Sequence, residues 1–144
     1  TIDPNAENQE DSFISATGGL DNQSNAPYLV YIEKFEQTVD NPHTFEDVLP
    51  DKFTLEEWNK LGRVDSETFL ALGINFLNEE GNKWRDLSQT DTLYVAQVDG
   101  ITPVLIGEID PHTTVKFILD ANHGNAFKNE ITTTYQVVWI FELA

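Results

Sequence analysis

Apolar and polar residues alternate with a period of two along most of this chain, which is the pattern of half-buried β-strands. Turn residues such as Asn, Gly and Pro separate the alternating runs. The runs cover residues 28–39, 68–77, 92–110, 113–122 and 131–143. About seven or eight strands spaced by turns predict an all-β fold, an antiparallel β-sandwich or jelly roll.

The last run is about twice the length of an ordinary strand. Its odd-numbered residues from Ile131 to Leu143 form a mostly apolar face that includes Tyr135, Trp139 and Phe141. Burying each large side chain of that kind contributes roughly 1.5–3 kcal/mol. We therefore expect this run to be a central strand of the sandwich.

One short helix interrupts the β pattern. Thr54 and Glu57 have the spacing of a capping box, in which each residue's side chain bonds to the other's backbone N–H. Gly62 is suited to the left-handed position that ends a helix. The sequence predicts a helix at residues 55–61, and a helix this short must pack on a larger structure to be stable.

The segment TLYVAQVDGITPVLIGEID has the composition of a β-hairpin. Asp99 and Gly100 fit the two central positions of a type I′ turn, both of which need positive φ. Pro103 has no N–H to donate, so its arm should lie at a sheet edge. We expect the two arms to pair with each other.

The first part of the chain differs from the rest. Residues 1–27 hold five acidic residues and no basic one, with many Asn, Gln, Ser and Gly residues. This composition predicts an N-terminal arm or long loop at residues 1–27, before a β-sandwich domain at residues 28–144. The arm's apolar clusters are Phe13-Ile14 and Leu20, which are enough to anchor a strand in a neighbouring subunit.

Charge and sulfur content narrow the function classes. The 25 acidic residues against 8 basic ones give a formal charge of −17, which disfavours nucleic acid and anionic membranes as partners. The chain has no cysteine and no methionine, so disulfides and zinc–thiolate sites are excluded. No membrane-spanning run is present in the sequence. We expect a mature secreted protein, located outside the cell or on its surface.

No catalytic motif is present in the sequence. His43, His112 and His123 each lie in a turn-like setting, which explains their polarity without a function. Metalloprotease, nucleophile-elbow, phosphate-binding and dinucleotide-binding motifs are all missing. We therefore expect no enzymatic activity.

Calcium is the cofactor that the acidic loops fit best, because it prefers several carboxylate, amide and carbonyl oxygens. The candidate ligands come from three polar segments of the chain. They are Asp3, Asp11, Asp21, Asp120 and Asn122. None of these segments matches the EF-hand pattern, and solvated acidic loops explain the same residues without a metal.

Three tryptophans raise the alternative of carbohydrate binding. Trp58 belongs to the predicted helix, and Trp139 lies on the apolar face of the last strand, where we expect it in the core. Trp84 follows a turn between Lys83 and Arg85, so it is the candidate for an exposed aromatic platform.

The C-terminal segment FILDANHGNAFKNEITTTYQVVWIFELA combines a turn at residues 124–127 with a long strand ending in Phe141 and Glu142. The segment INFLNEEGNKWRDL adds a strand that runs into an Asn- and Gly-containing turn. Together they resemble the TasA/camelysin-like secreted fibre proteins and the related archaeal pilus or tube subunits. The resemblance covers about a third of the chain. It implies a jelly-roll subunit whose N-terminal arm adds a strand to its neighbour, often with calcium at the joints.

We therefore predict a structural subunit of an extracellular filament or tube, such as a biofilm fibre, that forms a homopolymer by strand addition. Head-to-tail contacts of this kind do not close on themselves, so they build filaments. The alternative is a secreted β-sandwich module that binds a carbohydrate or a surface partner.

Overall fold

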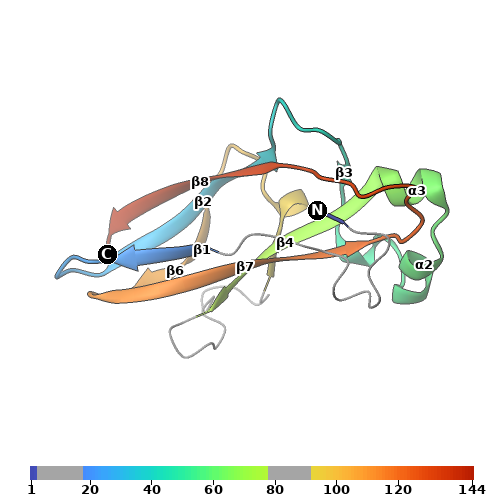
Figure 1. Ribbon diagram of the computed structural model, residues 1–144. Coiled ribbons are helices and arrows are strands. Elements are labelled where there is room, and N and C mark those ends of the chain that lie inside the picture. The colour runs from blue at the N-terminus through green and yellow to red at the C-terminus, as the bar shows by residue number, and fades with distance from the viewer. Residues whose placement is uncertain (3–17, 78–91) are drawn as a thin grey trace.

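Two β-sheets pack face to face in the computed structural model, which describes residues 1–2, 18–77 and 92–144 (Figure 1). Within these ranges the larger sheet has five strands, β1 (Gly18–Asn22), β7 (Thr113–His123), β4 (Phe69–Leu77), β3 (Glu46–Asp47) and β5 (Thr92–Tyr94). The smaller sheet has three, β6 (Val104–Ile109), β2 (Tyr28–Gln37) and β8 (Tyr135–Leu143). All described strand pairs are antiparallel except β3 with β4. The predicted all-β sandwich is confirmed.

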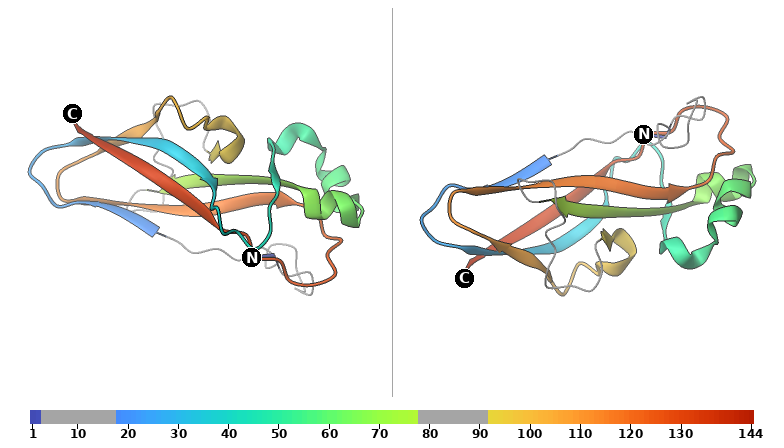
Figure 2. Two further views of the ribbon diagram at one scale, coloured as in Figure 1. Left: turned by 90° about the horizontal axis from the view of Figure 1, so that it is seen from above. Right: turned by 90° about the horizontal axis from the view of Figure 1, so that it is seen from below.

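The core between the sheets is apolar and rich in aromatic rings. β4 is buried on both faces, because seven of its nine residues are buried. Trp139 of β8 reaches across to the larger sheet, with its ring centroid 6.0 Å from that of Phe76 and 5.4 Å from that of Phe117. Figure 2 shows β8 running obliquely over the strands of that sheet. Trp139 is thus partly buried and packs against the core, as expected.

The predicted helix is present as α2 (Leu55–Lys60), at the opposite end of the sandwich from the C-terminus (Figure 1). Its capping box is complete: Glu57 N donates to Thr54 Oγ1 over 3.1 Å, and Thr54 N donates to Glu57 Oε1 over 3.0 Å. Trp58 anchors the helix, since its side chain is 1% exposed and its Nε1 donates to the Pro50 carbonyl over 2.8 Å. A 3₁₀ turn at Pro50–Lys52 precedes it.

The interpretation of Gly62 is wrong. Gly62 has φ −67°, outside the left-handed region, and it is the N-cap of a second short helix, α3 (Arg63–Thr68). The sequence of α3 has no capping side chain and no apolar stripe, so neither of the usual helix patterns was present. The helix runs directly into β4 at Phe69.

The predicted hairpin at Asp99 and Gly100 is also wrong. Its two arms belong to different sheets, because β5 pairs with β4 while β6 pairs with β2. Gly100 has the expected positive φ of 78°, but Asp99 does not, and a 3₁₀ turn at Val95–Gln97 breaks the first arm. The Asp99 carboxylate instead accepts hydrogen bonds from the backbone N–H groups of Ile101 and Thr102, which lowers its pKa. This segment carries the chain from one sheet to the other.

The last strand is not central. Within the described part of the chain, β8 pairs only with β2 and forms an edge of the smaller sheet. It begins at Tyr135 rather than at residue 131, and its final residues Phe141 and Leu143 are 49% and 66% exposed. The central strand is β2, which pairs with both β6 and β8. The apolar pattern correctly predicted a strand, but it could not distinguish the middle of a three-stranded sheet from its edge.

The capping box of α2 gives a direct test of the local structure. Replacing Thr54 with alanine removes an acceptor for the Glu57 N–H, so we expect the free energy of unfolding to fall by about 1 kcal/mol. Thr54→Ser keeps the acceptor and should retain most of the stability. Urea unfolding followed by tryptophan fluorescence measures both changes. Equal stability of the alanine variant and the wild type would mean that Trp58 burial alone holds the helix.

Candidate functional site

The predicted calcium ligands do not come together in the described residues. Asp21 lies opposite Thr114 on β7, whereas Asp120 lies six residues further along the same strand, about 20 Å away at the rise of an extended chain. The Asp21 carboxylate already accepts hydrogen bonds from Gln23 Nε2 (2.8 Å) and Thr114 Oγ1 (3.1 Å).

Asp120 and Asn122 share one face of β7, and Asp120 Oδ1 accepts from the Ala121 backbone N–H. Among the residues that the structure describes, no group of three or more His, Asp or Glu side chains is placed to hold a metal ion. Asp21 and Asp120 are therefore too far apart to bind the same ion. Asp3 and Asp11 lie outside the described residues.

Of the three predicted assembly residues, the structure describes only Leu20. Leu20 is in β1, opposite Val115 of β7, and packs against the core of its own subunit. Residues 18–22 of the predicted arm are thus a strand of the sandwich. Phe13 and Ile14 lie outside the described residues, and so does Trp84, the candidate platform for a glycan.

The N-terminal residues occupy a buried site on the sandwich. Ile2 is 1% exposed and belongs to the main apolar cluster. Its N–H donates to the Ile131 carbonyl over 2.7 Å, and the Ile131 N–H donates to its carbonyl over 3.0 Å, as in an antiparallel strand pair. The Thr1 and Thr132 hydroxyls are 3.1 Å apart. We call this contact of Thr1 and Ile2 with Ile131 and Thr132 the N-terminal docking site.

The Thr1 amine, an ionisable group at this site, is partly buried. Desolvation lowers the pKa of the Thr1 amine, and the nearby Glu130 carboxylate partly opposes the shift. His123, at the end of β7, is 4% exposed, and its Nδ1 donates to the Gly124 carbonyl over 2.7 Å. Burial lowers its pKa, and the hydrogen bond to the Gly124 carbonyl partly opposes this shift. His123 is therefore a core residue rather than a residue of an exposed turn.

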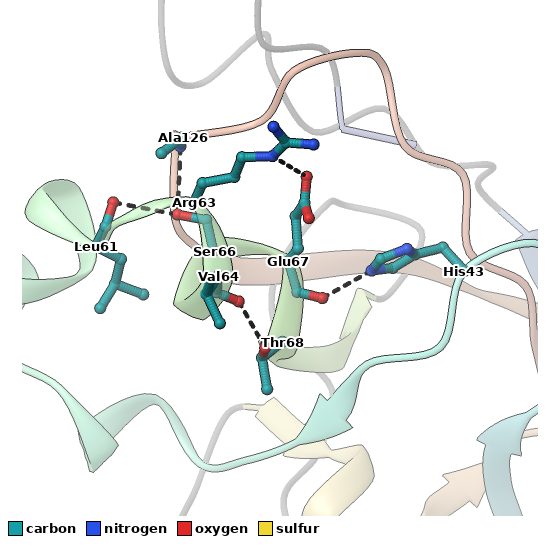
Figure 3. Close-up of polar contacts among 8 residues, drawn as sticks. All are labelled: His43, Leu61, Arg63, Val64, Ser66, Glu67, Thr68 and Ala126. Carbon is teal, nitrogen blue, oxygen red and sulfur yellow. Dashed lines mark hydrogen bonds and ion pairs between the residues drawn. The ribbon is translucent and has the colours of Figure 1, made fainter.

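Figure 3 shows the polar contacts that hold α3 in place. His43 Nε2 donates to the Glu67 carbonyl over 2.7 Å, and Arg63 Nε donates to the Glu67 carboxylate over 3.2 Å. Ser66 is fully buried; its hydroxyl donates to the Leu61 carbonyl and accepts from the Ala126 N–H, both over 3.3 Å. These contacts are structural, because the Ser66 hydroxyl bonds to backbone groups rather than to a base.

Gly124 lies directly against Ser66, and this close contact explains why the residue is a glycine. A Cβ at Gly124 would overlap the Ser66 side chain and approach its Cα. The loop that leads from β7 towards β8 can therefore lie against α3 only with glycine at this position. His112, the third histidine, is on the surface, with Nε2 2.7 Å from Asn25 Oδ1.

A partly buried carboxylate links the start of β8 to the rest of the sandwich. Asp47 of β3 accepts hydrogen bonds from Tyr135 Oη (2.6 Å) and Gln37 Nε2 (2.9 Å). Burial raises the pKa of Asp47, and these two hydrogen bonds limit the rise. Burial and the Asp47 carboxylate together raise the pKa of Tyr135 far above its ordinary value.

The same network continues to the segment before β8. Gln37 Oε1 accepts from Asn41 Nδ2 over 2.7 Å, and Asn41 Oδ1 accepts from the Thr134 N–H over 2.9 Å. The segment between the N-terminal docking site and β8 is thus held by side chains of the β2–β3 connection. The sequence does not reveal this network, because Thr134 and Tyr135 are 93 and 88 residues away from their partners Asn41 and Asp47.

Comparison with protein-family models, curated proteins and solved structures finds no match for this chain. The resemblance to TasA/camelysin-like fibre proteins therefore stays a prediction. None of the helices in the described ranges has the length and apolar character to cross a lipid bilayer.

The Asp47–Tyr135 pair predicts a specific dependence of stability on pH. The raised pKa of Tyr135 means that its neutral form stabilises the fold below about pH 10, the tyrosine value in unfolded chains, and that this contribution is lost as the pH rises above it. Tyr135→Phe removes both the hydrogen bond and the titration. We expect it to lower the free energy of unfolding by about 1–3 kcal/mol at neutral pH and to flatten the alkaline decline.

Chemical unfolding between neutral and strongly alkaline pH measures both effects. Tyr28→Phe is the matched control, because the Tyr28 hydroxyl has no hydrogen-bond partner among the described residues. An alkaline decline of equal slope in wild type and Tyr135→Phe would contradict this assignment.

Proposed function

We propose that the protein is a structural subunit of an extracellular filament or tube, and that subunits are linked by exchange of the N-terminal segment. The observation that carries the proposal is the N-terminal docking site. Residues 1–2 are held there by one buried side chain and a pair of backbone hydrogen bonds. The same contact can be made by residues 1–2 of a neighbouring copy, which is domain swapping.

The chain has the length to make this exchange. Residues 3–17 connect the docked Ile2 to β1, and fifteen residues span at most about 50 Å when extended. β1 fixes the other end of this connection, since its residues pair with β7. Each subunit would therefore donate one end while keeping its own sandwich intact, and repeated donation in one direction builds an open chain of subunits.

The proposal changes the role of the arm residues. Leu20 serves as the fixed base of the donor segment, because it packs in its own subunit. Ile2 becomes the residue that docks, and Phe13 and Ile14 belong to the segment that would bridge two subunits. Calcium remains a proposed partner of the acidic bridging segment, which contains Asp3 and Asp11.

The alternative is a secreted module that binds a glycan or a surface partner. It rests on Trp84 alone. A chain that remains monomeric at high concentration and binds immobilised glycans would favour this alternative over a structural role.

The decisive experiment places a charge at the docking residue. Ile2→Asp should abolish assembly, because an unpaired carboxylate is costly in a site where the native side chain is 1% exposed. Electron microscopy and sedimentation of the full chain, with and without calcium, measure assembly. Val39→Asp is the matched control, since it makes the same change at a fully exposed residue and should assemble normally.

A truncation tests the same idea from the other side. Removing residues 1–17 leaves β1 complete, so we expect a folded protein that no longer forms filaments. Circular dichroism verifies the fold. Assembly of the Ile2→Asp protein or of the truncated protein into the wild-type structures would overturn the exchange proposal.

A further inference from the structure

Among the described residues, the edge of β8 that faces away from β2 has no strand partner, and this free edge has an unusual combination of length and composition. It has nine residues, Tyr135–Leu143, of which only Glu142 is charged. Natural edge strands are commonly protected from pairing by lysine, proline or short length, and β8 has none of these devices. Phe141 and Leu143 are on its inward face but remain 49% and 66% exposed.

The backbone direction along β8 follows from two hydrogen bonds at its ends. The Thr134 carbonyl accepts from the Thr38 N–H over 3.0 Å, and the Ala144 N–H donates to the Pro27 carbonyl over 3.1 Å. Successive residues of a strand direct their N–H and C=O groups to opposite sides. Even-numbered residues therefore bond towards β2, and odd-numbered residues direct theirs to the free edge.

We propose that this edge pairs with β8 of a second copy of the chain, in an antiparallel, twofold-symmetric contact centred on Trp139. Centring on the middle residue of the strand pairs all nine residues. It also brings odd-numbered residues opposite odd-numbered residues, so roughly ten backbone hydrogen bonds can form. The two smaller sheets become one continuous sheet.

The side chains are complementary in this register. Phe141 lies opposite Val137 of the second copy, and Leu143 lies opposite its Tyr135, so the two exposed apolar residues gain apolar neighbours. On the outer face Val138 lies opposite Ile140. The single carboxylate of the strand, Glu142, lies opposite Gln136, so no like-charged pair forms despite the net charge of −17.

This contact is independent of the N-terminal docking site. It is isologous, because the same surface is used by both copies, and alone it stops at a dimer. Repulsion between two acidic subunits opposes it at low ionic strength, and salt screens that repulsion. We therefore expect a dimer that strengthens as salt is added.

A charge-swap series tests the register. Gln136→Lys places a lysine opposite Glu142 twice in the dimer, so the dissociation constant should fall by about 2- to 20-fold. In the double variant Gln136→Lys/Glu142→Lys, lysine faces lysine, and the dissociation constant should rise above that of Gln136→Lys. Analytical ultracentrifugation measures each value. If net charge alone governed association, the double variant would be the tightest, and that result would overturn the proposed pairing.

Cysteine cross-linking provides a second readout, since the chain has no cysteine of its own. Val138 and Ile140 would form a non-hydrogen-bonded pair with Cα atoms about 4.5 Å apart, within disulfide range. A mixture of Val138→Cys and Ile140→Cys proteins should oxidise to heterodimers, whereas a mixture of Val138→Cys and Glu142→Cys should do so far less. Equal cross-linking in both mixtures, or none in either, would overturn the register.

The Ile2→Asp variant distinguishes the filament proposal from the β8 dimer. The Ile2→Asp protein should still cross-link through β8 although it forms no filament. Cross-linking lost in Ile2→Asp would show that β8 pairing depends on the docked N-terminus and would overturn the independent dimer. A wild-type chain that stays monomeric at high concentration and high salt would overturn the β8 contact as well.

Discussion

The packing of Trp139 against Phe76 and Phe117 joins the edge strand of the smaller sheet to the larger sheet. The smaller sheet has only three described strands, and β8 is held to the larger sheet through its inward side chains. Because that face is anchored in the core, β8 needs no second neighbour to remain in place. The backbone N–H and C=O groups along its outer edge are thus available for pairing with another strand, whereas its inward side chains already pack against the core.

The fold was predictable from the sequence where local chemistry determines it. Alternation correctly indicated β2, β4, β6, β7 and most of β8, and the spacing of Thr54 and Glu57 correctly predicted the cap of α2. It gave no sign of β1, which lies in the predicted arm, or of the two-residue β3. Besides Gly62 and the missed helix α3, the main errors concern which strands are neighbours. Asp99 and Gly100 have turn chemistry, yet the arms on either side of them belong to different sheets. Partner choice depends on the packing of the whole chain, and no local pattern contains that information.

The same limit applies to the candidate site. Acidic residues such as Asp21 and Asp120 are each placed by a strand, and their distance apart follows from the sheet rather than from their spacing in the sequence. The N-terminal docking site was missed for a related reason. Ile2 is a single apolar residue in a polar segment, and only the pairing with Ile131 reveals where it is buried.

The buried position of Ile2 in its own subunit has a consequence for the rate of the proposed assembly. A docked N-terminus must leave its site before a neighbour can use it, so opening precedes association. When subunits are concentrated, collisions become fast and the opening step limits the rate. The half-time of filament growth should then level off with concentration, and a fresh solution of closed subunits should show a lag before filaments form.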